Sequence, residues 1–293
     1  MKICGFCDHR FDSARWVCPG CGGKPEEHDG FISLTQGTVV PGESFEPEYF
    51  KELYRLENDS FWFRHRARLI TKSVTRFFPP AGRVLEIGCG TGLVLSEIRK
   101  MFPGMAVSGS DLFTEGLRFA RKRANDVPLY QMDALRMPFV EEFDLVLALD
   151  IIEHIENDRK ALNEICRSVR PGGGVIITVP QHPWLWTIQD EKAFHKRRYT
   201  RSELVEKMEA QGLRVAYVTS FITLLLPAMV LSRLYGRYLN WDTDVCDHAR
   251  ELKIHPRLND IMQAVCSVEE AILGTGMSLP AGGSLLCVGI KEG

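Results

Sequence analysis

The nine residues Val84-Leu85-Glu86-Ile87-Gly88-Cys89-Gly90-Thr91-Gly92 decide the fold that the sequence predicts. Apolar residues end a buried strand, an acid interrupts them, and three alternating glycines precede a helical pattern that begins at Leu93. Glycines at this spacing let the backbone turn tightly and let a ligand approach without a Cβ in the way. The dinucleotide-binding pattern G-x-G-x-x-G would need a glycine at position 93, where Leu93 stands instead. The stretch therefore predicts a strand, a ligand-binding turn and a helix of a different type.

Further apolar segments follow at the spacing of a strand–helix repeat. We expect strands at 84–87, 106–110, 127–131, 143–149, 175–179, 213–219 and 284–290. Helical patterns separate the first five, which implies a parallel sheet covered on both faces. Asp111 ends the second strand, 19 residues after Gly92. A carboxylate at this place can accept hydrogen bonds from both hydroxyls of a ribose.

The form E-x-G-x-G-x-G and the acids behind the following strands resemble the class I S-adenosylmethionine (SAM) methyltransferases, over residues 80–220 and again at the C-terminus. The resemblance implies an α/β fold with a Rossmann-like, doubly wound sheet of seven strands, mostly parallel with an antiparallel last strand. It also implies that the glycine loop holds the methionine end of SAM, Asp111 the ribose and Asp133 the adenine amino group. The implied cofactor-binding residues are Glu86, Gly88, Cys89, Gly90, Gly92, Asp111, Leu112, Asp133, Ala134 and Asp150.

Four of the nine cysteines form a separate pattern near the N-terminus. They are spaced C-x2-C, ten residues, C-x2-C, and are Cys4, Cys7, Cys18 and Cys21. Two such knuckles can present four thiolates to a tetrahedral Zn²⁺. The pattern resembles a zinc ribbon, or rubredoxin, whose knuckles bind iron, and zinc is the expected ion. A site closed by four cysteines is structural, and the segment would either anchor the N-terminus or dock a partner. We expect it to span residues 1–36, followed by a linker at 37–43.

The composition restricts the classes of partner. With 36 basic and 38 acidic residues the formal net charge is −2, and residues 1–30 carry no basic stripe, so nucleic acid is not the expected partner. No apolar core of a signal peptide follows Met1, which predicts a cytoplasmic protein. The 18 uncharged residues at 215–232 are interpreted as a buried strand and a buried helix rather than a membrane span. Shallow membrane or lipid contact is the alternative.

Three segments bracket the expected position of the methyl group. The first contains Trp62 and Arg66. The second follows the fourth strand and contains His154, our first candidate for a general base. The third has the pattern V-P-x-H-P-x-L-W, then H-x-R-R-Y-T, which resembles a broad group of bacterial methyltransferases. The positions of this sequence that match the pattern are His182, Trp184, Trp186, His195, Arg197, Arg198 and Tyr199.

Roles follow from the chemistry of these side chains. His195 and Tyr199 join His154 as candidate catalytic acids or bases. Arg197 and Arg198 are candidates for holding a phosphate or carboxylate of the acceptor. The predicted substrate-binding set is completed by Trp62, Arg66, His182 and Trp186. Aromatic helix packing and a solvated basic turn are the structural alternatives for these segments.

Residues 45–293 are expected to form the methyltransferase domain, with a helical insertion at about 221–282. The insertion would cap the active site or form a homodimer interface, and its apolar character favours a hydrophobic or lipid-like acceptor. The predicted activity is transfer of the methyl group of SAM to a small molecule. Oxygen is favoured over nitrogen as the acceptor atom, because no N/D-P-P-Y/F tetrapeptide follows the fourth strand. An rRNA or tRNA methyltransferase and a non-catalytic SAM-binding adaptor are the alternatives.

Overall fold

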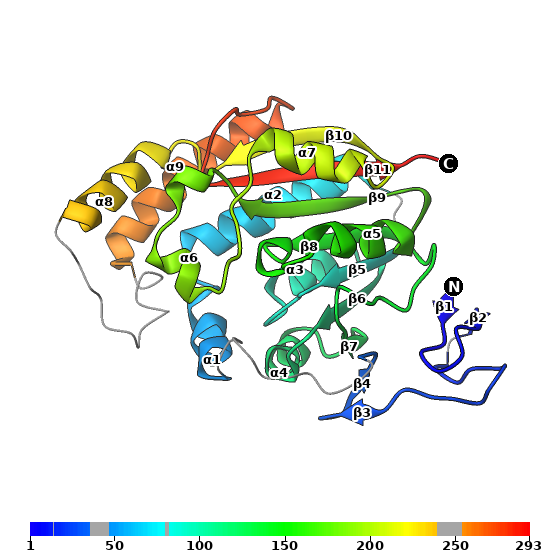
Figure 1. The fold of residues 1–293 in the computed structure, drawn as a ribbon. Coiled ribbons are helices and arrows are strands. Elements are labelled where there is room, and N and C mark those ends of the chain that lie inside the picture. Colours follow the sequence, from blue (N-terminus) through cyan, green and yellow to red (C-terminus); the bar gives the residue numbers. More distant parts are fainter. Residues whose placement is uncertain (14, 36–46, 80–81, 239–253) are drawn as a thin grey trace.

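The computed structural model describes residues 1–13, 15–35, 47–79, 82–238 and 254–293. One sheet in this part of the chain has the strand order β10-β11-β9-β8-β5-β6-β7-β4-β3 (Figure 1). Strands from β9 to β4 run parallel, whereas β11 is antiparallel to both β9 and β10. The bounds are β3 Glu27–His28, β4 Phe31–Ser33, β5 Arg83–Ile87, β6 Ala106–Asp111, β7 Leu129–Gln131, β8 Phe143–Leu149, β9 Val169–Pro180, β10 Leu213–Phe221 and β11 Ser284–Lys291.

Helices cover both faces of this sheet (Figure 1). They are α1 Pro47–Leu56, α2 Phe61–Phe77, α3 Leu93–Met101, α4 Thr114–Arg123, α5 Asp158–Ser168, α6 Ile188–Lys192, α7 Arg201–Glu209, α8 Leu226–Tyr238 and α9 Pro256–Gly274. Two short 3₁₀ helices, η1 Ile152–His154 and η2 Pro183–Leu185, follow β8 and β9. Among the helices of the described ranges, none has the length and apolar character that crossing a membrane requires.

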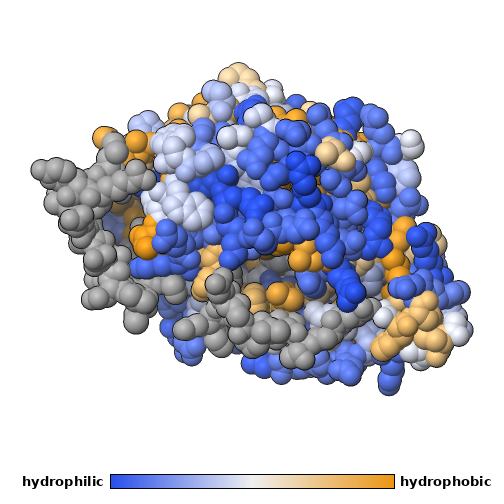
Figure 2. Space-filling model, in the orientation of Figure 1, coloured by the Kyte–Doolittle hydropathy of each residue, from blue (hydrophilic) through white to orange (hydrophobic). Residues whose placement is uncertain are grey.

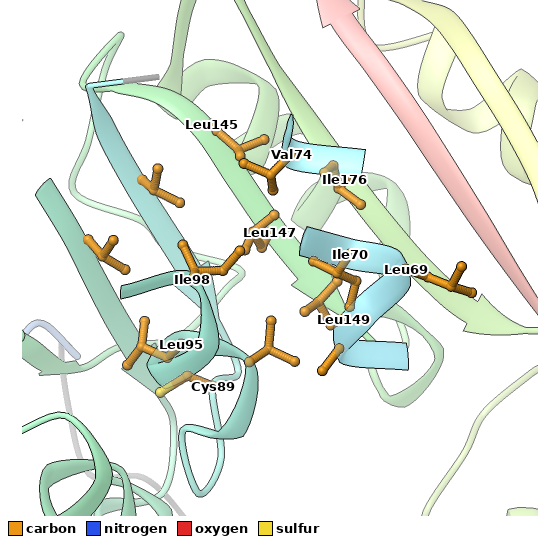
Figure 3. Packing of buried hydrophobic residues seen from close by; sticks show 14 of the residues in the cluster. Leu69, Ile70, Val74, Cys89, Leu95, Ile98, Leu145, Leu147, Leu149 and Ile176 are labelled. Atoms are coloured by element: carbon orange, nitrogen blue, oxygen red, sulfur yellow. The ribbon is translucent and has the colours of Figure 1, made fainter. Parts of the chain in front are cut away.

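Alternating side chains of the central strands divide the core into two layers, as the period of a strand requires. In β8, Leu145, Leu147 and Leu149 pack with α2, α3, α4 and α9, and Figure 3 shows part of this layer. Val146 and Ala148 point to the other face and pack with α5 and α7. Both layers are apolar, so β8 reads as a continuous hydrophobic run, as is typical of a strand buried on both faces.

The seven strands expected from the sequence are all present, and the antiparallel last strand is confirmed. Strand β9 begins at Val169, earlier than expected, because Val169 still pairs with Phe143 across an irregularity in the ladder. The sheet also gains β3 and β4, which the sequence analysis did not predict as strands. Both come from the segment that carries the four cysteines.

The N-terminal segment is therefore joined to the main sheet instead of forming a wholly separate unit. Its β1 (Lys2–Ile3) and β2 (Arg10–Phe11) form a small hairpin, while Ile32 and Ser33 of β4 pair in parallel with Tyr130 and Gln131 of β7. This pairing covers what would otherwise be the open edge of the main sheet at β7. The linker expected at 37–43 lies outside the described residues.

Two helices, α8 and α9, occupy the insertion expected at about 221–282, of which residues 239–253 lie outside the described part. Helix α9 packs along α2, and Cys266 and Leu273 of α9 join the core layer on that face. Arg233 of α8 donates to the backbone oxygen of Leu185 in η2. The insertion thus contacts both α2 and the loop after β9, two of the three segments expected near the acceptor.

Candidate functional site

The glycine loop connects β5 to α3 at the carboxyl end of the sheet. Gly88, Gly90 and Gly92 have φ values of 61°, 52° and 78°, a region that favours glycine. A Cβ on Gly88 would lie 1.9 Å from Cδ1 of Ile151, and one on Gly92 would lie 2.8 Å from Ala120. A Cβ on Gly90 would meet nothing within 4 Å. The outer glycines are required by packing, whereas Gly90 borders open space where a ligand can approach the backbone.

Asp111 ends β6 directly beside this loop. Its Oδ2 accepts a hydrogen bond from the Gly90 amide at 2.8 Å, and its Oδ1 accepts one from the Phe113 amide at 2.9 Å. Burial raises the pKa of Asp111 to about 6, although the backbone amides of Phe113 and Gly90 oppose the shift. The carboxylate is thus fixed next to the loop that the sequence analysis assigned to the cofactor.

Glu86 is buried in β5 beneath the loop, and its Oε2 has no hydrogen-bond partner within the described residues. Burial raises the pKa of Glu86 to about 8, and the charge of Arg66 opposes this rise. A buried carboxyl oxygen without a hydrogen-bond partner is costly. The position therefore suits a ligand that brings a hydrogen-bond donor or a positive charge.

Glu57, which the sequence analysis missed, holds the loop from the other side. Its Oε2 accepts from Thr91 Oγ1 at 2.6 Å and lies 2.7 Å from Nη1 of Arg123. The side chain is buried. Glu57 lies in the turn after α1, about 30 residues before the glycine motif, and no pattern in the sequence links the two. Helix α1 also places Phe50 against Gly116 and Phe113, on the side of Asp111.

Other predicted cofactor residues contribute in different ways. The side chain of Cys89 is buried in the core layer beside Leu95 (Figure 3). Only the backbone of Cys89 therefore remains available to a ligand at the glycine loop. Asp133 follows β7, and its Oδ1 accepts from the Leu135 amide at 2.8 Å. The backbone oxygen of Leu112 accepts from Gln131 Nε2 at 3.1 Å, and Ala134 is half-buried. Leu112, Asp133 and Ala134 thus lie on the loops that follow β6 and β7.

Asp150 follows β8 and joins two predicted segments. It has a φ of 55°, unusual for a residue with a side chain, and its Oδ2 accepts from Nη1 of Arg66. The Arg66 guanidinium lies 4.7 Å from the ring centroid of Trp62 and 5.7 Å from that of Phe63. The start of α2 therefore contacts the end of β8, and the predicted substrate residues Trp62 and Arg66 lie beside the predicted cofactor residue Asp150.

The candidate bases His154 and His195 lie together. Their ring centroids are 4.7 Å apart, although 40 residues of sequence separate them. Nδ1 of His195 lies 2.9 Å from Oδ1 of Asp190, which also accepts from Nε of Arg198 at 2.7 Å. Burial, and to a smaller extent the neighbouring His195, lower the pKa of His154 to about 4. His154 is therefore neutral at pH 7.

Three residues of the third segment form hydrogen bonds or ion pairs with acidic residues of the chain. Tyr199 is fully buried, and its hydroxyl donates to Oδ2 of Asp158 at 2.7 Å. Burial and Asp158 raise the pKa of Tyr199 far above its ordinary value. Arg198 is buried against Asp190, and Arg197 donates to the Glu156 backbone oxygen and contacts Asp158 at 3.2 Å. Both arginines therefore pair with carboxylates of the chain, Arg197 with Asp158 and Arg198 with Asp190.

The loop after β9 presents aromatic side chains near these residues. His182 has a φ of 64°, and its ring centroid lies 5.2 Å from that of Trp184. Trp184 is 57% exposed. Nε1 of Trp186 donates to Glu191 at 3.2 Å. Burial, together with the charge of Arg198, lowers the pKa of His182. His182 and Trp184 thus come together, whereas Trp186 is turned towards α6.

The four N-terminal cysteines converge as the spacing predicts. Their sulfur atoms lie within 4.8 Å of one another, with Cys4 Sγ 3.7 Å from Cys21 Sγ and Cys7 Sγ 3.7 Å from Cys18 Sγ. Sulfur atoms at the corners of a tetrahedron around Zn²⁺ lie ~3.8 Å apart, since Zn–S distances are about 2.3 Å. The separation is far longer than a disulfide bond. The donor set and its geometry therefore fit a tetrahedral Zn²⁺.

A cavity of about 1140 Å³ lies elsewhere, between the cysteine segment and the main sheet. Gln131 and Leu135 of the main domain line it together with His28 and Ser33 of the segment. The glycine loop, Asp111 and His154 are not among its lining residues. Its size alone does not mark the chemical site, because the buried carboxylates and the glycine loop lie apart from it.

The residues of the loop fit SAM by the chemistry of their side chains. Glu86 offers a buried oxygen without a hydrogen-bond partner within the described part of the chain, Asp111 offers a fixed carboxylate, and Gly90 leaves open space. SAM carries a positively charged sulfur and an ammonium group, which complement two buried acids. The same position would be unfavourable for an anionic phosphate ligand.

Comparisons with known proteins agree with this geometry. The family model described as a methyltransferase domain matches residues 85–177. The chain is 29% identical over 137 residues to a demethylmenaquinone methyltransferase of Chlorobaculum parvum, covering 46% of this chain and 56% of that protein. It is 36% identical over 99 residues to a fatty-acid O-methyltransferase of Mycolicibacterium smegmatis, covering 33% of this chain and 36% of that protein. These matches therefore span only part of each relative's length.

A solved structure shares the fold. It is phosphoethanolamine N-methyltransferase 2 of Haemonchus contortus in complex with SAM, with a TM-score of 0.55 and 20% identity, covering 86% of this chain and 58% of that chain. The similarity extends beyond the segment that the family model matches. The likeness concerns the α/β architecture, on which the glycine loop and the following acids occupy the carboxyl end of the sheet.

Proposed function

We propose, since this chain belongs to the class I SAM-dependent methyltransferases, that it transfers the methyl group of SAM to the oxygen atom of a small, apolar acceptor. The observation that carries the proposal is the buried pair of acids, Glu86 and Asp111, on either side of a glycine loop whose central residue borders open space. The acceptor, and the activity of the whole protein, belong to the proposal.

SAM supplies an electrophilic methyl group on a positively charged sulfur. Glu86 would accept from its ammonium group, Asp111 from its ribose hydroxyls, and Asp133 would lie near the adenine. The loop backbone at Gly90 allows close approach because no Cβ stands in the way. Arg66 and Asp150 fix the start of α2 against the end of β8, where the acceptor must be aligned with the methyl group and water excluded.

Exposed apolar side chains support a lipid-like acceptor. Among the described residues, six of the twelve large apolar side chains that remain exposed lie in the insertion, and they are Leu224, Leu231, Leu258, Ile261, Val268 and Met277. Elsewhere the face of the molecule shown in Figure 2 is mainly hydrophilic. The named activity of the fatty-acid O-methyltransferase agrees with both parts of the proposal, an oxygen atom and an apolar acceptor.

The four-cysteine site would hold a structural Zn²⁺. All four corners are thiolates, so no open position remains for a substrate. Its role in this proposal is to order the N-terminal segment that pairs with β7. His28 Nδ1 lies 3.1 Å from Gln131 Oε1, and Gln131 also contacts the Leu112 backbone. The zinc segment would thereby support the loops that hold the adenosine.

Calorimetric titration with SAM tests the cofactor assignment. We expect Asp111→Asn to weaken SAM binding by roughly tenfold to a hundredfold, because a hydrogen bond to a charged group contributes about 1.5–3 kcal/mol. Asp126→Asn is the matched control, since Asp126 is half-exposed and contacts only Arg99 among the described residues. Equal affinities of the two variants would contradict the assignment.

Product formation tests the acceptor. Fatty acids and hydroxylated apolar compounds would be incubated with the enzyme and SAM, and S-adenosylhomocysteine measured. We expect turnover with an apolar hydroxyl or carboxyl compound and none with RNA. SAM binding without product for every acceptor would favour a non-catalytic adaptor, and steeply salt-dependent RNA binding would favour the RNA-modifying alternative.

A further inference from the structure

A second cluster of metal-ligating side chains lies at the acceptor side of the proposed SAM site. Glu153 and His154 come from η1, directly after β8, and His195 comes from the loop after α6. One ligand atom of each lies within 4.8 Å of the others. Donor atoms around one first-row metal ion lie up to about 4.4 Å apart, given metal–ligand distances of about 2.0–2.2 Å. Small side-chain rotations would therefore bring all three onto one ion.

Glu153 is the residue that points to a ligand. Its side chain is fully buried, and neither carboxylate oxygen has a hydrogen-bond partner in the part of the chain that the structure describes. A buried carboxylate is normally hydrogen-bonded, paired or bound to a metal. Its neighbours here are two imidazole rings.

His195 is oriented as a metal-binding histidine is. Its Nδ1 lies 2.9 Å from Asp190, and Asp190 also accepts from Arg198 and from the Thr187 amide at 2.8 Å. The Asp190 carboxylate accepts the proton of His195 Nδ1, which leaves Nε2 as the donor atom. This is the carboxylate–histidine arrangement common in metal sites.

The ring of His154 is also held by hydrogen bonds, in this case to the backbone. Carbonyl groups of Phe194 and Ala193 accept from its ring, which selects one tautomer. Phe194 has a φ of 57°, a strained conformation for a residue with a side chain, and the Lys196 amide donates to the Glu153 backbone oxygen at 2.7 Å. The loop that carries His195 is thus held against η1 at the expense of backbone strain.

We propose that Glu153, His154 and His195 form a binding site for a divalent first-row transition-metal cation. Two imidazoles and one carboxylate leave coordination positions open, and this ligand set suits ions such as Mn²⁺ or Fe²⁺. Ile151 lies against Gly88, so the site adjoins the glycine loop. The site requires both histidines as ligands, which replaces the general-base role predicted for them.

The role of the cation rests on the proposed function. An oxygen atom of the acceptor would occupy an open position on the ion and lose its proton to solvent, because a bound cation lowers the pKa of a hydroxyl. In the transfer, the oxygen lone pair forms the new O–CH₃ bond, the S–CH₃ bond breaks, and its electron pair stays on sulfur. The ion is neither oxidised nor reduced.

Electron paramagnetic resonance with Mn²⁺ tests the site without any acceptor. The full chain would be loaded with Zn²⁺ at the four cysteines and titrated with Mn²⁺. We expect one bound Mn²⁺ per chain, and at least tenfold weaker binding by Glu153→Gln, which keeps the side-chain shape. Glu156→Gln, three residues away and 85% exposed, is the matched control and should bind as the unsubstituted protein does. His195→Ala provides a second variant, and circular dichroism shows that each variant is folded.

The outcomes separate this inference from the proposed function. If no Mn²⁺ binds, or if Glu153→Gln and Glu156→Gln bind it equally, the cation site is overturned, whether or not SAM binds. If Mn²⁺ binds as expected but calorimetry shows no SAM binding, the cation site stands and the methyltransferase proposal fails. Loss of S-adenosylhomocysteine formation when Mn²⁺ is omitted, with SAM binding intact, would support the stated role.

Discussion

The absence of a side chain at Gly88 allows the segment after β8 to lie directly on the glycine loop. We expect Gly88→Ala to lower the free energy of unfolding by about 1–3 kcal/mol, because its Cβ would lie 1.9 Å from Ile151 and its φ is 61°. Gly104→Ala is the control, since a Cβ there meets nothing within 4 Å. Urea unfolding of both variants measures the difference, and equal losses would show that Ile151 moves aside freely.

Single residues also show where sequence reasoning succeeds. Asp111 and the glycines were predictable because a ligand-binding turn constrains spacing along one short stretch. The burial of Tyr199 and Arg198 could not be predicted, because whether such a side chain faces a ligand or the interior depends on Asp158 and Asp190, which come from other elements. Glu57 was missed since its partner Thr91 is distant in sequence. The roles of the cofactor residues remain predictions until SAM binding is measured.

At the scale of elements, the long strands were predictable and the short ones were not. Strand β8 has seven residues, six of them apolar, which indicate a buried strand, whereas β3 and β4 have two and three residues, too few for any period. Strand β4 pairs with β7 because the cysteine segment lies beside that edge of the sheet. The ring centroids of Trp16 and Tyr130 are 5.8 Å apart there. A local pattern could indicate the metal knuckles but not where they would dock.

This docking makes the metal site and the main sheet interdependent. We expect Cys18→Ser to weaken zinc binding by roughly tenfold or more, because one of four thiolate ligands is lost. The melting temperature should fall with it, and SAM affinity should also decrease, since β4 supports the loops after β6 and β7. Zinc release during thermal unfolding and calorimetry with SAM measure these effects.

Lys24→Ala, at an exposed position of the same segment, is the control for that variant. It should leave zinc content, melting temperature and SAM affinity unchanged. If Cys18→Ser loses zinc while SAM affinity stays constant, the segment anchors the N-terminus without supporting the cofactor loops.

For the whole molecule, one buried charge cluster joins parts of the chain that are about 200 residues apart. His65 of α2 is fully buried between two acids of α9, with Nε2 3.1 Å from Glu269 and Nδ1 3.1 Å from Glu270. Glu269 also accepts from the amides of Ile222 and Thr223 at 2.7 Å. The insertion is thereby tied to the helix that carries Arg66, a connection that neither helix's own sequence reveals.

The cluster predicts that the free energy of unfolding decreases both at high pH and at low pH. Burial alone would lower the pKa of His65, but its bonds to Glu269 and Glu270 raise it above its usual 6.5. Burial would likewise raise the pKa values of both acids, yet His65 lowers them below 4.5. The His65 contribution is fully present below pH 6.5 and is lost as pH rises through the raised pKa. The contribution of the acids is present above pH 4.5 and is lost as pH falls through the lowered values.

His65→Gln keeps hydrogen-bonding capacity but removes the charge. We expect it to lower the free energy of unfolding by about 3–5 kcal/mol near pH 5.5, because the buried Glu269 loses its counter-charge and Glu270 keeps only Arg68 and Lys72, each at 3.5 Å. The loss should shrink at alkaline pH, where His65 itself is neutral, and also in strong acid. Urea unfolding from pH 4 to 9 measures it, with His255→Gln, an exposed histidine beside α9, as the control. A loss that stayed constant across this range would mean that His65 contributes through packing and hydrogen bonds rather than through its charge.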